Sequence, residues 1–216
     1  VFYSQDKHEH NQSSNLDQID SLIINNPVSL EHAAEFGSLV IQDSGGRMKP
    51  LNTFASELLR KVSKSDTYKG LNADQVLVSI IKNPISWYNV PIIYLKRGND
   101  SIRKIAGRNK KEKYASFVDF FDENGSYKIS SQLEAAYKAS LPNQFQKDFI
   151  ELDRRVNLLF SAFEGKILRI FPIPNDFNNK WVAFPDVQPK DFEGIDSLYV
   201  KNVLPLYLGA LDNDIE

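Results

Sequence analysis

The stretch Leu39–Lys64, which reads LVIQDSGGRMKPLNTFASELLRKVSK, constrains the fold more than any other part of the chain. A short apolar run is followed by Gly45-Gly46 and Pro50, and apolar residues then recur at spacings of three and four up to Val62. This spacing gives a helix one apolar face, and proline suits a first helical turn, where its missing N–H has no partner. We therefore predict a short strand, a tight glycine turn and an amphipathic helix.

Length and charge bound the class of protein. The chain has 216 residues, 42% of them apolar, which is enough for a sizeable buried core. A formal net charge of -2 argues against general polyanion binding, and the lack of cysteine excludes disulfides, thiolate metal ligands and cysteine nucleophiles. The apolar stretch Val203–Leu211 is shorter than the ~20 residues that a membrane helix needs, so we predict no span in this chain. Because it starts at Val1 without a signal sequence, we expect a fragment or a processed product.

Side-chain caps and helical periodicity mark further helices. A Ser or Asn side chain before an apolar repeat accepts a backbone N–H at a helix start, whereas Gly and Pro mark helix ends. In the long helix after Asn143, we place Asp153, Arg154 and Arg155 on the flank of the buried stripe. The predicted helices are Ser29–Gly37, Asn72 to Asn83, one from Ser116, one from Ser130 or Ser131, Asn143 to Gly165, and a final helix or helix pair within Asp191–Glu216 that breaks at Pro205.

The remaining segments complete the predicted fold. Val90–Leu95 is predicted as an edge strand because it contains Pro91, and KILRIFPIPNDFNNKWVAF (166–184) as a short strand followed by a proline-rich ordered loop. The fold class is therefore α+β, predominantly helical, with a few short strands. The polar residues 1–20 are predicted to be a flexible segment and residues 21–216 a single globular domain.

The glycine turn is the first candidate binding site. Backbone N–H groups at Gly45 and Gly46, together with Arg47 and Lys49, can form an anion site, although neither phosphate-loop pattern is present. The alternative is a structural turn whose arginine pairs with a carboxylate. Trp181 is the second candidate, either in a ligand groove or as an anchor for the proline-rich loop.

We predict no catalytic residue and no metal site. His8 and His10 lie in the polar segment without a fixed third ligand, and His32 has no visible partner. The turn Asp122–Gly125 fails as a calcium loop, because Phe120 and Ser131 occupy the positions of the first and last carboxylates.

Two alternative functions remain open. The segment Lys96–Lys113 carries eight basic residues against two acidic ones, a pattern that suits either polyanion binding or a solvated loop. The carboxylates Asp119, Asp122 and Asp153 leave room for a hydrolase or transferase, but nothing in the sequence places any two of them together.

Three patches carry a family resemblance: IQDSGGRMKPLNTFASELLRK (41–61), SFVDFFDENGSYKIS (116–130) and LDRRVNLLFSAFEGKILRIFPIPND (152–176), followed by Trp181. Their order and spacing resemble the extracytoplasmic domain of the large system II cytochrome c biogenesis proteins, the fused haem exporter and synthase of Bacteroidetes. The resemblance covers roughly residues 30 to 185.

This resemblance implies an extracytoplasmic domain at the periplasmic face of the inner membrane, in a protein that attaches haem to apocytochrome c. It implies a recognition or scaffolding module rather than the catalytic site. The expected partners are apocytochrome c and the membrane-spanning parts of the same protein, with no nucleic acid. Haem is expected to be handled by other parts of the full-length protein and no cofactor by this fragment, because Trp87 and Trp181 are isolated and no matching histidine is present.

Overall fold

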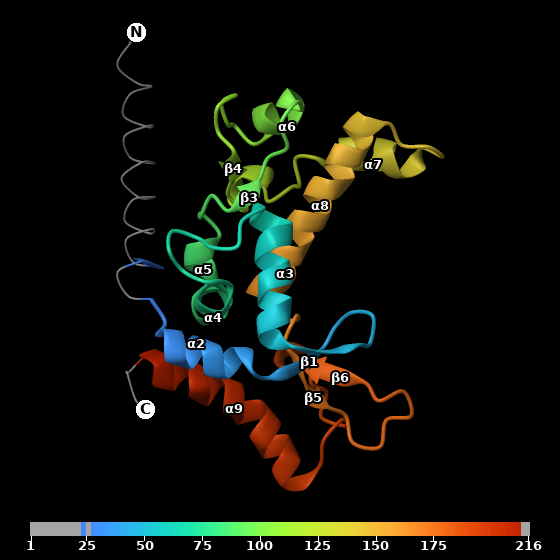
Figure 1. Ribbon diagram of the computed structural model, residues 1–216. Coiled ribbons are helices and arrows are strands. Elements are labelled where there is room, and N and C mark those ends of the chain that lie inside the picture. The colour runs from blue at the N-terminus through green and yellow to red at the C-terminus, as the bar shows by residue number, and fades with distance from the viewer. Residues whose placement is uncertain (1–22, 25–26, 213–216) are drawn as a thin grey trace. The chain divides into compact units, whose positions relative to one another are not determined.

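The computed structural model describes residues 23–24 and 27–212, and most of their regular structure is helical (Figure 1). The predicted fold class, a predominantly helical α+β fold with a few short strands, is confirmed. The helices are α2 (Leu30–Gly37), α3 (Leu51–Ser63), α4 (Ala73–Lys82), α5 (Pro84–Trp87), α6 (Asp100–Ile105), α7 (Ser130–Lys138), α8 (Gln144–Phe163) and α9 (Gly194–Asp212), with 3-10 helices η1 (Val118–Phe120) and η2 (Phe184–Asp186). The strands are β1 (Val40–Gln42), β2 (Met48–Pro50), β3 (Ile93–Tyr94), β4 (Tyr114–Ala115), β5 (Arg169–Pro172) and β6 (Trp181–Ala183).

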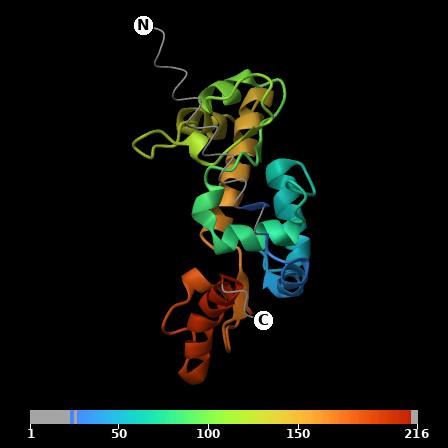
Figure 2. The same ribbon diagram turned by 90° about the vertical axis from the view of Figure 1, so that its left-hand side faces the viewer.

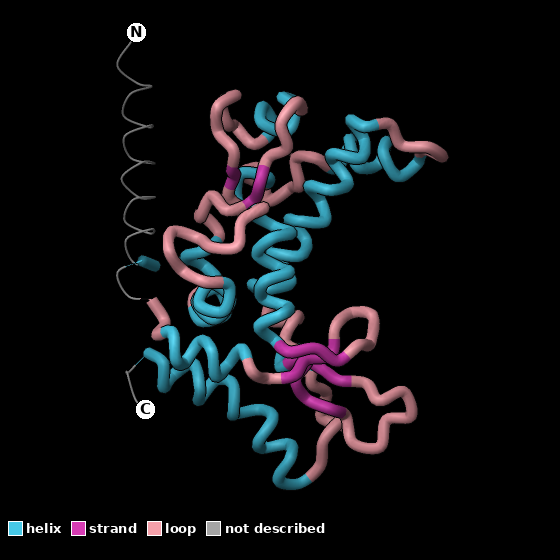
Figure 3. The backbone as a smooth tube through the Cα atoms, viewed as in Figure 1, coloured by secondary structure: helices cyan, strands magenta, loops and turns pink. Residues whose placement is uncertain are grey.

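The strands within the described residues form three antiparallel pairs, shown in magenta in Figure 3. β1 pairs with β2, β3 with β4, and β5 with β6. The proline-rich segment therefore contains a hairpin, in which Phe171 lies opposite Val182 and both side chains are buried. Its ordered loop is confined to residues 173–180, between the two strands.

The chain divides into two compact units, each built from segments that are distant in sequence. The first contains Leu59–Leu71 and Ile85–Leu159, and the second contains Val28–Leu58, Asn72–Pro84 and Phe160–Glu216. The single domain predicted over residues 21–216 stays a prediction. The predicted flexible segment 1–20, which includes His8 and His10, lies outside the described residues.

Side-chain caps start two helices of the second unit, as predicted. The hydroxyl of Ser29 accepts the backbone N–H of His32 at the start of α2. Asn72 and Gln75 exchange side-chain and backbone hydrogen bonds in a capping box at the start of α4. The side-chain amide of Gln75 also donates to the carbonyl of Val28 (2.8 Å), so the cap of α4 fixes the chain just before α2.

Helices α2 and α4 approach each other closely at position 37, where glycine fits without displacing its neighbours. A Cβ atom on Gly37 would lie 3.1 Å from the carboxyl group of Asp74 and 3.2 Å from Cβ of Asn52. Gly37 lies within α2 as its last residue, and Ser38 serves as the C-cap. The glycine that we predict as a helix stop therefore also allows two helices to pack closely.

The core of the second unit joins the β5–β6 hairpin to α9, which lies beside it in Figure 2. Phe171 and Val182 from the hairpin pack with Phe192 and Val200. The predicted break at Pro205 is wrong, because α9 runs without interruption from Gly194 to Asp212. Pro205 is exposed, so the carbonyl that loses its N–H partner there can be hydrated.

The buried stripe of α8 builds the core of the first unit. Phe149, Leu152, Val156 and Leu159 are almost fully buried, as their spacing predicts. The predicted flanking position of Arg155 is wrong, because its side chain is buried within the first unit. Polar groups of the folded chain surround its guanidinium and compensate its charge, and helical periodicity in the sequence does not reveal them.

Three short elements of the first unit differ from the prediction. The helix expected from Ser116 is only the 3-10 turn Val118–Phe120, and the basic segment contains the helix α6, which is capped by Asn99. The predicted strand Val90–Leu95 is paired only at Ile93 and Tyr94. Short elements lack enough periodic positions to mark their bounds.

Candidate functional site

The glycine turn between β1 and β2 is filled by a carboxylate of the chain itself. Asp43 accepts the backbone N–H groups of Gly45 (2.8 Å) and Arg47 (3.1 Å) and pairs with Lys49 (3.2 Å). These contacts, the hydrogen bond from the Arg47 backbone first among them, lower the pKa of Asp43. Gly46 has a φ of 80°, which explains glycine at that position.

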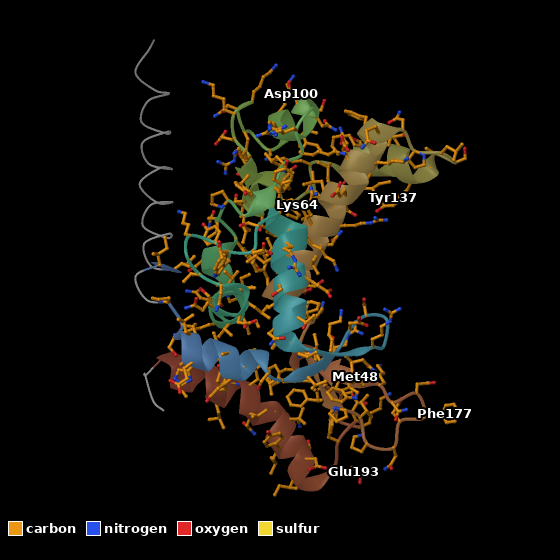
Figure 4. The ribbon with its side chains drawn as sticks, in the orientation of Figure 1. Met48, Lys64, Asp100, Tyr137, Phe177 and Glu193 are labelled. Carbon is orange, nitrogen blue, oxygen red and sulfur yellow. The ribbon has the colours of Figure 1, made fainter. Side chains whose placement is uncertain are left out.

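The two cations of the turn differ in their surroundings. Lys49 lies between two carboxylates, 3.2 Å from Asp43 and 3.3 Å from Glu57, and its hydrogen bond to Asp43 raises its pKa. The side chain of Arg47 is exposed, as is that of Met48, which Figure 4 labels in the same hairpin. Of the two predicted cations, Arg47 is the one open to solvent.

Buried Gln42 ties this hairpin to the β5–β6 hairpin. Its side-chain amide donates to the carbonyl of Asn179 (3.0 Å) and its side-chain oxygen accepts the backbone N–H of Trp181 (2.8 Å). Arg169 in β5 also donates to the carbonyl of Asp43 (3.3 Å). The structure therefore brings Trp181 next to the hairpin that carries the other predicted site residues.

The indole of Trp181 lines an apolar cavity of about 690 Å³ in the second unit. We call it the α2–α9 cavity, since these two helices and strands β1, β5 and β6 supply most of its walls. Its volume lies within the range of small-ligand sites, ~300–1,000 Å³. The residues that line it are Glu35, Phe36, Leu39, Val40, Ile170, Phe171, Pro172, Pro174, Trp181, Phe192, Asp196, Tyr199, Val200, Val203, Leu204 and Tyr207.

An aromatic pair forms one wall of the α2–α9 cavity. Phe36 and Tyr207 are stacked, with ring centroids 5.0 Å apart and planes at 8°. The hydroxyl oxygen of Tyr207 is buried and has no hydrogen-bond partner in the described structure. Burial, together with the charge of Glu35, raises the pKa of Tyr207. This wall of the cavity is therefore aromatic, and the hydroxyl oxygen of its tyrosine is shielded from solvent.

The basic segment is only partly available for binding. Lys96 pairs with Asp148, Arg108 with Asp119 and Lys110 with Asp100. Arg103 is buried and donates to the carbonyls of Leu95, Lys96, Asn99 and Glu112. Three of its eight cations, Lys96, Arg103 and Arg108, thus serve the internal structure of the first unit, whereas the pair of Lys110 lies on the surface.

The three carboxylates considered for catalysis each have a local partner. Asp119 accepts from Arg108 and from the backbone of Ser116, and Asp122 accepts two backbone N–H groups of its own turn, which lowers its pKa. Asp153 accepts from Tyr137 (3.3 Å) and Asn157 (2.9 Å). Figure 4 labels Tyr137, whose side chain is largely exposed.

Within residues 23–24 and 27–212, no group of three or more histidine or acidic side chains is close enough to hold a metal ion. The half-buried His32 donates its backbone N–H to the Ser29 cap. In the same part of the chain, no helix is both long and apolar enough to cross a membrane.

Asp148 gives the first unit a predictable response to acid. Burial opposes its ionisation, but hydrogen bonds from Lys96 (2.6 Å), Gln144 (2.7 Å) and Asn99 outweigh burial and lower its pKa below 3.8. The unfolded chain then binds more protons than the folded one, so stability present above pH 3.8 is lost as the pH falls through the lowered pKa. Asp148→Asn should flatten this fall in urea-unfolding free energy between about pH 5 and 2.

Replacing the lysine tests the cause of that shift. In Lys96→Met, the carboxyl group loses its strongest favourable partner while burial still opposes ionisation, so the NMR titration of the Asp148 carboxyl carbon should move to higher pH. An unchanged titration midpoint in Lys96→Met would contradict the assignment of the lysine as the cause.

Most of the cavity is not predictable from the sequence. Of its lining residues only Trp181 was proposed as a ligand contact, although Pro172 and Pro174 were placed in the proline-rich loop. Tyr199, Val203 and Tyr207 recur at a spacing of four in α9, a signal that marks a shared helix face but does not show that the face borders a cavity.

Fold and site together define a predominantly helical α+β domain with an apolar, aromatic cavity of ligand size. No protein-family model matches the chain. Over 158 residues, 71% of the chain, it is 35% identical to protein NrfI of Wolinella succinogenes. The match covers 17% of NrfI, so the chain spans less than a fifth of that relative.

Proposed function

We propose that this chain is a domain of a cytochrome c maturation protein and acts in haem attachment. The observation that carries this proposal is the 35% identity to NrfI over 158 residues. NrfI is a system II-like cytochrome c maturation protein, the haem lyase for cytochrome c nitrite reductase. Identity at this level over most of the chain supports a cytochrome c biogenesis role.

Within that role, we propose a recognition or scaffolding module at the periplasmic face of the inner membrane, for apocytochrome c or for the membrane-spanning parts of the same protein. The three sequence patches support this finer assignment, including the fused haem exporter and synthase of Bacteroidetes as the family. On this proposal haem is handled elsewhere in the full-length protein, and the fragment itself is neither the synthase nor a cofactor site.

The candidate residues have distinct roles in this proposal. Gly45 and Gly46 shape the turn, Lys49 holds it to α3 through Glu57, and Arg47 is the cation open to a partner. Trp181 contacts a ligand in the α2–α9 cavity. The internal use of Lys96, Arg103 and Arg108 favours this proposal over a polyanion-binding module.

Titration of the isotopically labelled chain with a peptide from an apocytochrome c haem-attachment site tests recognition by NMR. We expect shift changes that saturate and that cluster on a continuous surface of one unit. Arg47→Ala should weaken binding if the glycine turn contributes, with little change in stability because this side chain is exposed. The absence of shift changes at millimolar peptide would overturn recognition of the haem-attachment peptide.

A further inference from the structure

The α2–α9 cavity is open to solvent, and several of its apolar side chains are incompletely covered. Leu39, Val40 and Tyr199 line it with exposed fractions of 39%, 46% and 62%. Single exposed apolar residues are ordinary on a protein surface, but a continuous apolar wall that leads into a cavity is typical of a binding groove. The groove suits a large apolar side chain that enters from solvent.

The charged groups of the cavity all have the same sign. Glu35 from α2 and Asp196 from α9 line it, and none of its described lining residues is Lys, Arg or His. Glu193, which Figure 4 labels just before α9, adds an exposed carboxylate in the same segment. A ligand with a basic group next to its apolar group therefore matches the charges of this cavity, whereas an acidic ligand is repelled.

The hydroxyl oxygen of Tyr207 is shielded from solvent, so a ligand that enters the cavity meets mainly apolar surface. The selectivity of the cavity therefore rests on its apolar wall and on its two carboxylates. A peptide in which a large apolar side chain lies next to a basic residue meets both conditions within one short segment.

We propose that the α2–α9 cavity binds an extended peptide segment of a partner protein that inserts a large apolar side chain flanked by a basic residue. The apolar walls hold the side chain, and Glu35 and Asp196 attract the basic group. This inference places the proposed recognition function at one site and rests on that function only for the identity of the partner.

The two tryptophans provide a direct reporter. Trp87 is fully buried in the first unit, whereas Trp181 lines the cavity. In Trp87→Phe, tryptophan fluorescence therefore comes from Trp181 alone, at the proposed site. A synthetic peptide with a central Phe flanked by Arg should shift the Trp181 emission to shorter wavelength in a saturable manner that weakens with salt. The same peptide with Glu in place of Arg should bind at least about 10-fold more weakly.

Charge variants identify the contact. Glu35→Gln combined with Asp196→Asn should weaken binding of the Arg peptide about 10-fold. The same double variant should not weaken binding of the Glu peptide. Asp66→Asn is the matched control, because it removes a carboxylate that is 77% exposed in the first unit, and it should leave both affinities unchanged. Circular dichroism spectra of the variants should remain those of the parent chain.

Four outcomes overturn the proposal. Equal binding of both peptides shows an apolar site without charge selection, and a spectral shift that follows protein concentration without peptide shows a second copy in the cavity. Equal weakening of the Arg peptide by Asp66→Asn shows non-specific attraction. Absence of binding by either peptide removes the cavity as a peptide site, while the cytochrome peptide titration decides the recognition function separately.

Discussion

Replacement of Arg155 by alanine is expected to lower the free energy of unfolding of the first unit by about 3 kcal/mol or more. The side chain is only 4% exposed and donates to the carbonyls of Lys61 (3.1 Å) and Tyr94 (3.1 Å). It also pairs with Glu151 and lies over the ring of Tyr94. Alanine leaves two carbonyl groups without this donor and creates a cavity among α3, β3 and α8.

Urea unfolding at neutral pH measures this loss. Arg154→Ala is the matched control, because the neighbouring arginine is exposed, and we expect a change within about 0.5 kcal/mol. Arg155→Lys keeps the positive charge but not the planar fork of donors, so it should recover only part of the stability. A loss below about 1 kcal/mol in Arg155→Ala would show that water replaces the guanidinium at both carbonyls.

Arg103→Ala is expected to have a similarly large effect, concentrated in residues 95–113. Its guanidinium donates to the carbonyls of Leu95 (3.0 Å), Lys96 (2.8 Å) and Glu112 (3.1 Å), so one side chain holds both ends of the segment. We expect a loss of about 3 kcal/mol and much faster amide hydrogen exchange across β3, α6 and β4.

The control for this variant is Lys104→Ala. Lys104 is the exposed neighbour in α6, and its loss should leave exchange rates in residues 95–113 unchanged. Arg103→Lys should resemble the alanine variant, since one ammonium group cannot reach carbonyls that are arranged around a planar guanidinium. Full stability in Arg103→Lys would mean that charge, and not the hydrogen-bond fork, holds the segment together.

These two arginines illustrate where sequence interpretation fails. Arg103 lies within a basic run that predicts a solvated loop or a polyanion-binding surface, and Arg155 lies where periodicity predicts the flank of a helix. Both are buried, because backbone carbonyl groups converge on their guanidinium groups, from the flanking residues 95–112 for Arg103 and from the distant Lys61 and Tyr94 for Arg155. Charge patterns count residues along the chain, whereas the burial of a charge depends on partners that only folding brings together.

The helices were the most predictable part. The caps at Ser29 and Asn72 and the buried stripe of α8 depend on residues within a few positions of one another, and the structure has all three. The sequence does not predict the β5–β6 hairpin as a hairpin, because both strands are short and β5 ends in a proline. The sequence predicts a break at Pro205, but the effect of a proline within a helix depends on whether the freed carbonyl can be hydrated.

The candidate site likewise has a part that the sequence predicts and a part that it does not. The glycine turn was recognised from its sequence, and its filling by Asp43 required the geometry that aims backbone N–H groups of Gly45 and Arg47 at one carboxylate. Trp181 was proposed as a possible ligand contact, yet the cavity around it involves residues from Glu35 to Tyr207. No local pattern connects α2 with α9.

The sequence by itself determined the helical character, the positions of the caps and the core face of each long helix, because these depend on spacing and on contacts between near neighbours. Only the tertiary structure decided which charged groups are buried and where an apolar cavity forms. Burial and cavities arise from residues far apart in the chain, and their free energies depend on packing geometry, which local propensity does not encode.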